Sequence, residues 1–152
     1  MVEHQFIVFS LNNEEFGLAI NTVREIVQLQ KIINLPQESE LIEGIMSLRK
    51  EILPVVDLKK RFYGMAAGDV ETNRIIVVDI GGWLVGIIVD EVLEVLSLQE
   101  KDIVPLPPFV QRVTADCGLQ GVGRFSGRLV ILLDLSQAFS GDEKSLLQEA
   151  VN

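Results

Sequence analysis

The chain has few of the side chains on which enzymes depend. Its 152 residues include one cysteine, Cys117, and one histidine, His4. Nucleophilic catalysis by cysteine needs a base beside the thiol, and a structural zinc site needs about four Cys or His ligands. A single cysteine also excludes an internal disulfide and is typical of proteins from a reducing compartment. We therefore predict no catalytic, metal-binding or cofactor-binding site.

Basic residues and long apolar segments are also scarce. Lys and Arg number 13 against 22 Asp and Glu, which gives a net charge of −9, and a field of this sign repels phosphate backbones and anionic lipids. The most apolar stretch, residues 75–89, is interrupted by Asp79, Gly81 and Gly82 and is too short to cross a bilayer. The N-terminus does not resemble a signal peptide. We predict a cytoplasmic protein with no nucleic acid partner and no direct membrane insertion.

What the chain does contain is an internal repeat. Residues 5–30 align without a gap with residues 74–99 at an offset of 69, and residues 52–62 align with residues 129–139 at an offset of 77. The second copy is therefore longer by 8 residues. Identical pairs in the two blocks include Gly17/Gly86, Val23/Val92, Glu25/Glu94, Asp57/Asp134 and Phe62/Phe139. A duplicated unit predicts two similar lobes, and we expect the functional surface at the junction between them.

Runs of β-branched and aromatic residues predict strands in both copies. The expected strands cover residues 5–11, 16–20, 22–29, 45–48 and 51–56 in the first copy, and 74–80, 83–89 and 91–98 in the second. Arg49–Lys50 and Gly81–Gly82 fall at hairpin turns. Pro54 cannot donate to a ladder, so we expect its strand at a sheet edge or bulge. Several short strands per copy favour a small closed barrel in each lobe.

These elements predict a mainly β fold with short helices. We expect a single domain over residues 1–152, with one lobe at about 5–66, a linker over 63–72, a second lobe at about 72–140, and a C-terminal helix at about 141–151. One or two helical turns are also expected between Pro36 and Gly44.

Asp57 and Asp134 allow two interpretations. Each follows an apolar run and precedes a short helical pattern, so each can cap a helix. Two equivalent carboxylates at a junction between lobes also occur in aspartic proteases, where they share one proton. The small residues that let such a pair approach are absent here, which favours the capping interpretation.

Four stretches together carry a distinctive pattern: QFIVFSLNNEEFGLAINTVREIV, IEGIMSLRKEILPVVDLKKRF, VGIIVDEVLEVLSLQEKDIVPLP and GVGRFSGRLVILLDLSQAF. They resemble the CheW-like family, the chemotaxis coupling proteins, over about residues 5–139. The resemblance implies two SH3-like five-stranded barrels joined around a shared core, and an adaptor without catalytic activity. It implies that the adaptor links the cytoplasmic tips of chemoreceptors to the regulatory domain of a chemotaxis histidine kinase.

The resemblance also implies which residues bind. Val23, Glu25, Gly44 and Arg49 fall on family positions associated with receptor and kinase binding, and Ile87 and Val89 are candidates for the wall of an apolar groove between the lobes. The family usually has Gly after the signature Arg, where this chain has Lys50. If that turn needs positive φ, Lys50 strains it by about 1 kcal/mol. Two alternatives stay open: an adaptor of the same family in another pathway, and an aspartic-type hydrolase using Asp57 and Asp134.

Overall fold

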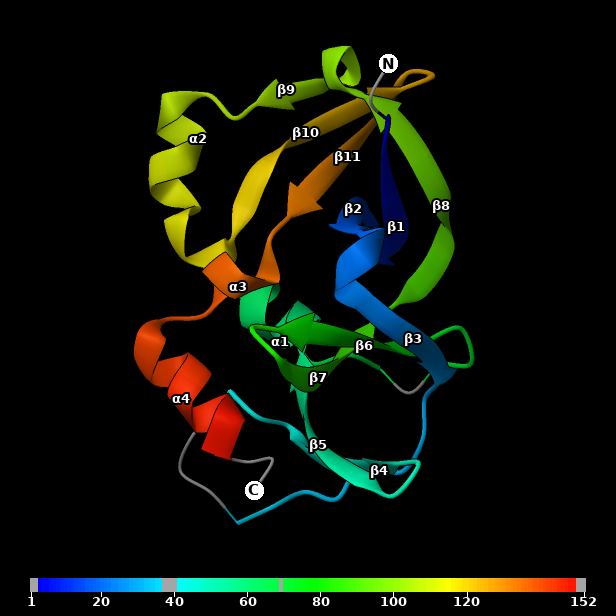
Figure 1. Cartoon of the computed structure of the whole chain (residues 1–152), viewed down its shortest axis with the longest axis vertical. Helices are drawn as coiled ribbons and strands as arrows, with labels where there is room; N and C mark the ends of the chain where they lie inside the picture. Colours follow the sequence, from blue (N-terminus) through cyan, green and yellow to red (C-terminus); the bar gives the residue numbers. More distant parts are fainter. Residues whose placement is uncertain (1–2, 37–40, 69, 150–152) are drawn as a thin grey trace.

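The protein consists of two β-sheets stacked end to end, with short helices along one side (Figure 1). The computed structural model describes residues 3–36, 41–68 and 70–149. The prediction of a mainly β fold with two lobes and short helices is confirmed, and one lobe has six strands where five were expected.

The upper sheet in Figure 1 defines the six-stranded lobe, with strand order β8-β1-β2-β11-β10-β9. Its strands are β1 (Glu3–Leu11), β2 (Glu14–Ala19), β8 (Glu91–Gln99), β9 (Ile103–Pro105), β10 (Leu119–Phe125) and β11 (Arg128–Leu133). Its helices are η2 (Glu100–Asp102), α2 (Pro108–Val113), η3 (Ala115–Cys117) and α3 (Leu135–Ala138).

The lower sheet defines the five-stranded lobe, with strand order β3-β6-β7-β5-β4. Its strands are β3 (Val23–Gln28), β4 (Gly44–Leu48), β5 (Glu51–Asp57), β6 (Arg74–Ile80) and β7 (Trp83–Val89). The remaining helices are η1 (Ile20–Thr22), α1 (Leu58–Tyr63) and α4 (Gly141–Glu149).

The lobes do not follow the limits 5–66 and 72–140 that the repeat suggested. Hairpin β1–β2 of the first copy lies between β8 and β11 of the second, and hairpin β6–β7 of the second copy lies between β3 and β5 of the first. The two copies have therefore exchanged their first hairpins. A repeat identifies equivalent strands, but equivalent strands carry the same pattern, so it cannot tell which copy supplies each partner.

Three apolar clusters hold this arrangement together. The interior of the six-stranded lobe contains Phe6, Val8, Leu96, Leu98, Val130 and Leu132, and the interior of the five-stranded lobe contains Met46, Leu53, Val55, Ile75, Val77 and Ile88. The third and largest cluster lies between the lobes and takes buried side chains from β1, β2, β5, β6, β7, β11, α1, α3 and α4. We call it the shared core.

Four hairpins turn through two residues that both have positive φ, the geometry of the type I′ turn. The turn residues are Asn12–Asn13, Arg49–Lys50, Gly81–Gly82 and Ser126–Gly127. The repeat relates the first turn to the third and the second to the fourth. The predicted hairpin around Arg49–Lys50 is confirmed. Lys50 has a φ of 75°, so the condition under which it strains the turn is met.

Asp57 and Asp134 both cap short helices, as the capping interpretation predicted. The Asp57 carboxylate accepts from the Lys60 N–H at 3.2 Å at the start of α1. The Asp134 carboxylate accepts from the Ser136 N–H at 3.0 Å at the start of α3.

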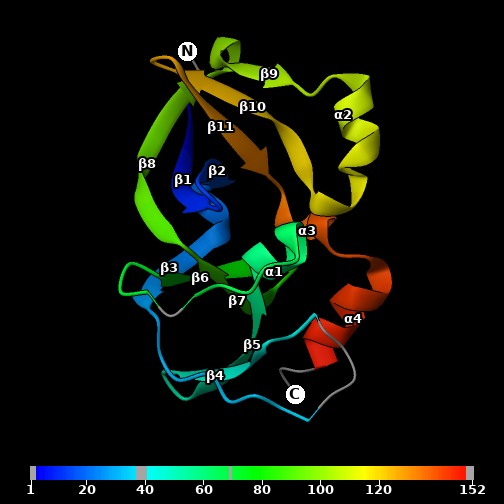
Figure 2. The same ribbon diagram turned by 180° about the vertical axis from the view of Figure 1, so that it is seen from behind.

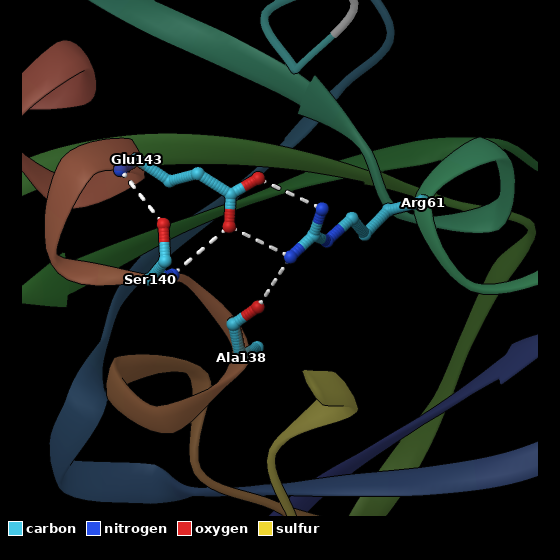
Figure 3. A network of polar contacts seen from close by, with 4 residues as sticks. All are labelled: Arg61, Ala138, Ser140 and Glu143. Carbon is cyan, nitrogen blue, oxygen red and sulfur yellow. Dashed lines mark hydrogen bonds and ion pairs between the residues drawn. The ribbon is translucent and has the colours of Figure 1, made fainter. Parts of the chain in front are cut away.

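Helix α4 is fastened to the lobes by a polar network centred on Arg61 of α1 (Figure 3). The guanidinium makes a bidentate pair with Glu143, both bonds 2.8 Å long, and donates to the Ala138 carbonyl at 2.9 Å. Ser140 and Glu143 exchange hydrogen bonds as a capping box. One turn further along the same face of the helix, Leu147 is fully buried in the shared core.

Three finer predictions have different outcomes. Pro54 was expected at an edge or bulge, but β5 is an interior strand; its parallel pairing with β7 begins only at Val55, which explains how the proline is tolerated. Of the helical turns expected between Pro36 and Gly44, residues 37–40 lie outside the described residues, and residues 41–43 are irregular. Helix α4 is confirmed to Glu149, and its predicted end at 151 also lies outside them.

Candidate protein-binding surfaces

The edge strand β3 presents the most distinctive candidate surface. It carries alternating side chains along the open edge of the five-stranded sheet: Val23 and Glu25 are half-buried, whereas Arg24 and Ile26 are exposed. Val23 packs against the shared core. An exposed edge with an apolar side chain on it can pair with or pack against another protein.

Arg49 lies beside this edge although it belongs to the β4–β5 hairpin. Its Nη1 is 2.8 Å from Oε2 of Glu25, and the Glu25 side chain is only 20% exposed. The Arg49 side chain is 79% exposed, so the rest of its guanidinium faces solvent. The structure therefore brings together two of the predicted site residues, one from the edge strand β3 and one from the β4–β5 turn. We call Val23, Arg24, Glu25, Ile26 and Arg49 the β3 surface.

A hollow of about 580 Å³ adjoins the β3 surface at the end of the five-stranded lobe. Arg24 and Lys50 supply cations to its wall, and Trp83 and Ile52 supply apolar surface. Ile52 is 51% exposed. The local charges balance, because Arg24 pairs with Asp79 at 3.9 Å, Arg49 pairs with Glu25, and Glu51 lies in the same lining as Lys50.

Gly44 is buried and does not reach the surface. A Cβ added there would clash with the Ile33 carbonyl oxygen. This close approach lets Ile33 and Ile45 form an isolated bridge, with N–H···O distances of 2.8 and 3.0 Å. Gly121 meets the Val104 carbonyl in the same way in the other lobe. Gly44 thus positions the segment after β3, and its buried backbone presents no surface to a partner.

Ile87 and Val89 are not in an exposed groove wall. Both side chains are 0% exposed and belong to the shared core. The reason is that β7 is an interior strand with residues 85–89 buried on both faces. The predicted groove wall at these two positions is wrong, because the junction at β7 is filled by packing.

A second ion-pair centre, not predicted from the sequence, uses the glutamate equivalent to Glu25 but an arginine at a different position of its hairpin. Arg128 contacts Glu94 at 2.8 Å and also Glu15, so it ties the β10–β11 hairpin to β8 and β2. The hydrogen bonds that Arg128 donates to Glu15 and Glu94 raise its pKa above the usual value. Glu94 is the repeat equivalent of Glu25. The conserved identity of Glu25 and Glu94 within the repeat was the available sequence signal, because each of these glutamates accepts a hydrogen bond from an arginine of a neighbouring hairpin.

Helix α2 carries exposed apolar side chains that were also missed. Phe109 is 64% exposed and Val113 is 63% exposed, and a spacing of four residues puts them on one side of the helix. The helix lies within the 8-residue insertion that distinguishes the second copy. Figures 1 and 2 show α2 and β3 on opposite sides of the molecule.

The described residues contain little that could support catalysis. Burial raises the pKa of the Cys117 thiol, which opposes formation of the thiolate nucleophile, although the nearby Arg61 acts in the other direction. Within residues 3–36, 41–68 and 70–149, no group of three or more His, Cys, Asp or Glu side chains could hold a metal ion. No helix in the same ranges is long and apolar enough to cross a membrane.

Comparison with known proteins gives a consistent result. Residues 5–143 match the sequence model of the CheW-like domain. The chain is 34% identical to the chemotaxis protein CheW of Klebsiella aerogenes, over 96% of this chain and 87% of that protein. It is 30% identical to the chemotaxis protein CheW of Treponema pallidum, over 99% and 88%. The crystal structure of the scaffolding protein TtCheW from Thermoanaerobacter tengcongensis superposes with a TM-score of 0.82 at 38% identity, covering 93% and 96%.

Proposed function

Because this chain belongs to the CheW-like domain family, whose members are scaffolds of chemotaxis signalling and not enzymes, we propose that it couples chemoreceptor tips to the regulatory domain of a chemotaxis histidine kinase. Both partners would be met in the cytoplasm. The observation that supports this proposal is a pair of exposed candidate surfaces, the β3 surface and helix α2, on opposite sides of the two-lobed protein.

The β3 surface is the better match to a receptor tip. A helical hairpin offers apolar and acidic side chains, which Ile26 and Arg49 would respectively contact. Arg49 is held in direction by Glu25, yet most of its guanidinium is free to donate charge-assisted hydrogen bonds. Val23 and Gly44 would act by supporting the edge, since one is half-buried and the other is buried.

Helix α2 is the better match to the kinase. Phe109 is the most exposed large apolar side chain described in the protein, and exposed aromatic residues are frequent anchors at protein interfaces. Because α2 and β3 lie on opposite sides of the molecule, both surfaces would be accessible at the same time. An adaptor needs this property, because it must hold two partners together.

The test measures the two interactions separately. Arg49→His should weaken binding of a receptor-tip fragment by about 10-fold or more, the equivalent of losing one hydrogen bond to a charged group, with unchanged binding of the kinase regulatory domain. Phe109→Ser should have the opposite pattern. Calorimetry of each pair, followed by gel filtration of all three proteins, gives both readouts.

The matched control for Arg49 is Arg124→His, which changes an exposed arginine of β10 on the other lobe and should alter receptor binding by less than about twofold. Equal losses in the two arginine variants would remove Arg49 from the site. The absence of a ternary complex with the wild-type chain would contradict the adaptor function itself.

A further inference from the structure

The repeat gives each lobe an equivalent open end, which we call its mouth. In the five-stranded lobe the mouth is a hollow of about 460 Å³ whose lining includes Ile32, Glu43 and Ile88. In the six-stranded lobe it is a hollow of about 540 Å³ whose lining includes Ile103, Gln120 and Ala19. The two linings contain three pairs of equivalent residues. The offset of 69 relates Ala19 to Ile88, and the offset of 77 relates Glu43 to Gln120. Ile32 corresponds to Ile103 because each precedes a residue of a matching bridge, Ile33–Ile45 in one lobe and Val104–Val122 in the other.

In the five-stranded lobe, the protein's own linker occupies the mouth. Ala66, Ala67 and Gly68 form part of its lining, and Ala67 packs against the interior of the lobe. The Ala67 N–H donates to Oδ2 of Asp57 at 2.7 Å, and the Asn73 side-chain amide donates to the Gly68 carbonyl. Asp57 and Asn73 are 6% and 3% exposed, because the linker covers them.

In the six-stranded lobe, the repeat equivalent of Asn73 is His4 and the equivalent of Asp57 is Asp134. No described segment covers these two side chains. After α3 the chain turns away into α4, which packs on the shared core instead. The His4 side chain is 42% exposed and Asp134 is half-buried. Oδ2 of Asp134 has only a long 3.4 Å contact with the exposed Gln120 amide. One lobe thus holds a peptide segment at a site that its counterpart leaves open.

We propose that the mouth of the six-stranded lobe binds an extended segment of a partner protein, as the other mouth binds residues 66–68. The segment would have small apolar residues and one carbonyl accepting from His4, which lines the hollow. One N–H would donate to Asp134, which lies behind the lining residue Gln120, with its Oδ2 3.4 Å from the Gln120 amide. Glu3 lies on the rim, and Glu100 lies 3.8 Å from His4. This acidic rim favours lysine or arginine beside the small residues and disfavours acidic segments. The site is separate from the β3 surface and from α2.

The probe is the capped peptide KGMAAGK, which places residues 64–68 of this chain between two lysines. Added to the isotope-labelled full chain, it should shift the amide signals of Phe6, Ala19, Ile103 and Gly121 in a saturable way. A tethered segment that is bound has a Kd no higher than its effective concentration, which is about 1 mM for a short linker, so we expect the free peptide to bind with a Kd of about 1 mM or below. The peptide KGMDDGK, with the two alanines replaced, should bind at least about 10-fold more weakly.

The variant Gln120→Trp places a large side chain in the mouth from an exposed position and should weaken binding of KGMAAGK by at least about 10-fold. Gln148→Trp, an equally exposed change on α4, should leave it unaltered. Absence of saturable shifts up to about 10 mM, shifts at other residues, or equal binding to both variants would overturn the proposal. Such failure would leave the roles of Arg49 and Phe109 untouched, since neither residue lines this mouth.

Discussion

Of the four hairpin turns, only the one beside the β3 surface has two side chains ill-suited to positive φ. Arg49 and Lys50 have φ of 48° and 75°, whereas the other turns use asparagine, serine or glycine. Asparagine and glycine adopt this region at low cost, and long unbranched side chains do so at a cost of about 1 kcal/mol per residue. The strain is therefore located at the turn that carries the proposed receptor anchor.

Lys50→Gly should raise the free energy of unfolding by about 0.5–1 kcal/mol, because glycine removes the steric cost of positive φ. The repeat supplies a matched control: Gly127 occupies the equivalent position, has φ of 79°, and a Cβ added there would meet no atom within 4 Å. Gly127→Lys should lower the free energy of unfolding by a similar amount. Urea unfolding measures both, and a destabilised Lys50→Gly protein would contradict the argument.

Individual site residues were predictable where the signal was local. The signature around Arg49 identified an exposed arginine in a hairpin, and that placement is confirmed. Its pairing with Glu25 depends on how the five-stranded sheet curves to bring the β4–β5 turn beside β3, which no local pattern encodes. The prediction that Ile87 lies in a groove wall was wrong for a different reason. A continuous apolar run is typical of a strand buried on both faces, so the run around Ile87 indicates a buried position.

At the scale of elements, strand positions were predicted well and strand partners were not. Strands β6 and β7 match their predicted limits of 74–80 and 83–89, because alternation and turn residues are local signals. The exchange of the first hairpins between copies depends on which lobe each hairpin enters after a short connection. Long-range packing determines whether a hairpin pairs with strands of its own copy or of the other copy. Because the strands of the two copies are equivalent, the repeat is compatible with both arrangements.

The Arg61 network should determine how firmly α4 is docked. Arg61→Met keeps an apolar stem beside Phe139 but removes the bidentate pair and the bond to Ala138. Arg61 is 27% exposed, so we expect a loss of about 1–2 kcal/mol in unfolding free energy, the lower part of the range for charged hydrogen bonds. Amide exchange at Leu147 should quicken in parallel.

Lys60→Met is the matched control for Arg61→Met, since Lys60 is the neighbouring residue of α1 and pairs with Glu43 at 3.7 Å through more exposed side chains. Such a pair contributes about 0–0.5 kcal/mol. Equal changes in the two variants would show that Arg61 acts as an ordinary surface charge.

At the scale of the whole molecule, the lobes are one folding unit rather than two. The shared core takes side chains from both sheets and from α4, and it is larger than either lobe interior. Asp90 adds a polar link, because it accepts from the Asn12 N–H at 2.8 Å and pairs with Lys59 at 3.6 Å. Unfolding one lobe would expose the apolar face of the other, so both should unfold together.

The exchanged hairpins lead to a sharp expectation for fragments divided at the linker. Residues 1–67 and 68–152 each contain one copy of the repeat, but each lacks the partner hairpin for its own strands. Separately, each fragment should lack a cooperative thermal transition, because its sheet edges and its half of the shared core are exposed. Mixed in equal amounts, they should associate and recover the β-sheet circular dichroism of the intact chain. A fragment 1–67 that unfolds cooperatively as a monomer would mean that a copy can pair its own hairpin with its own strands, contrary to the observed strand order.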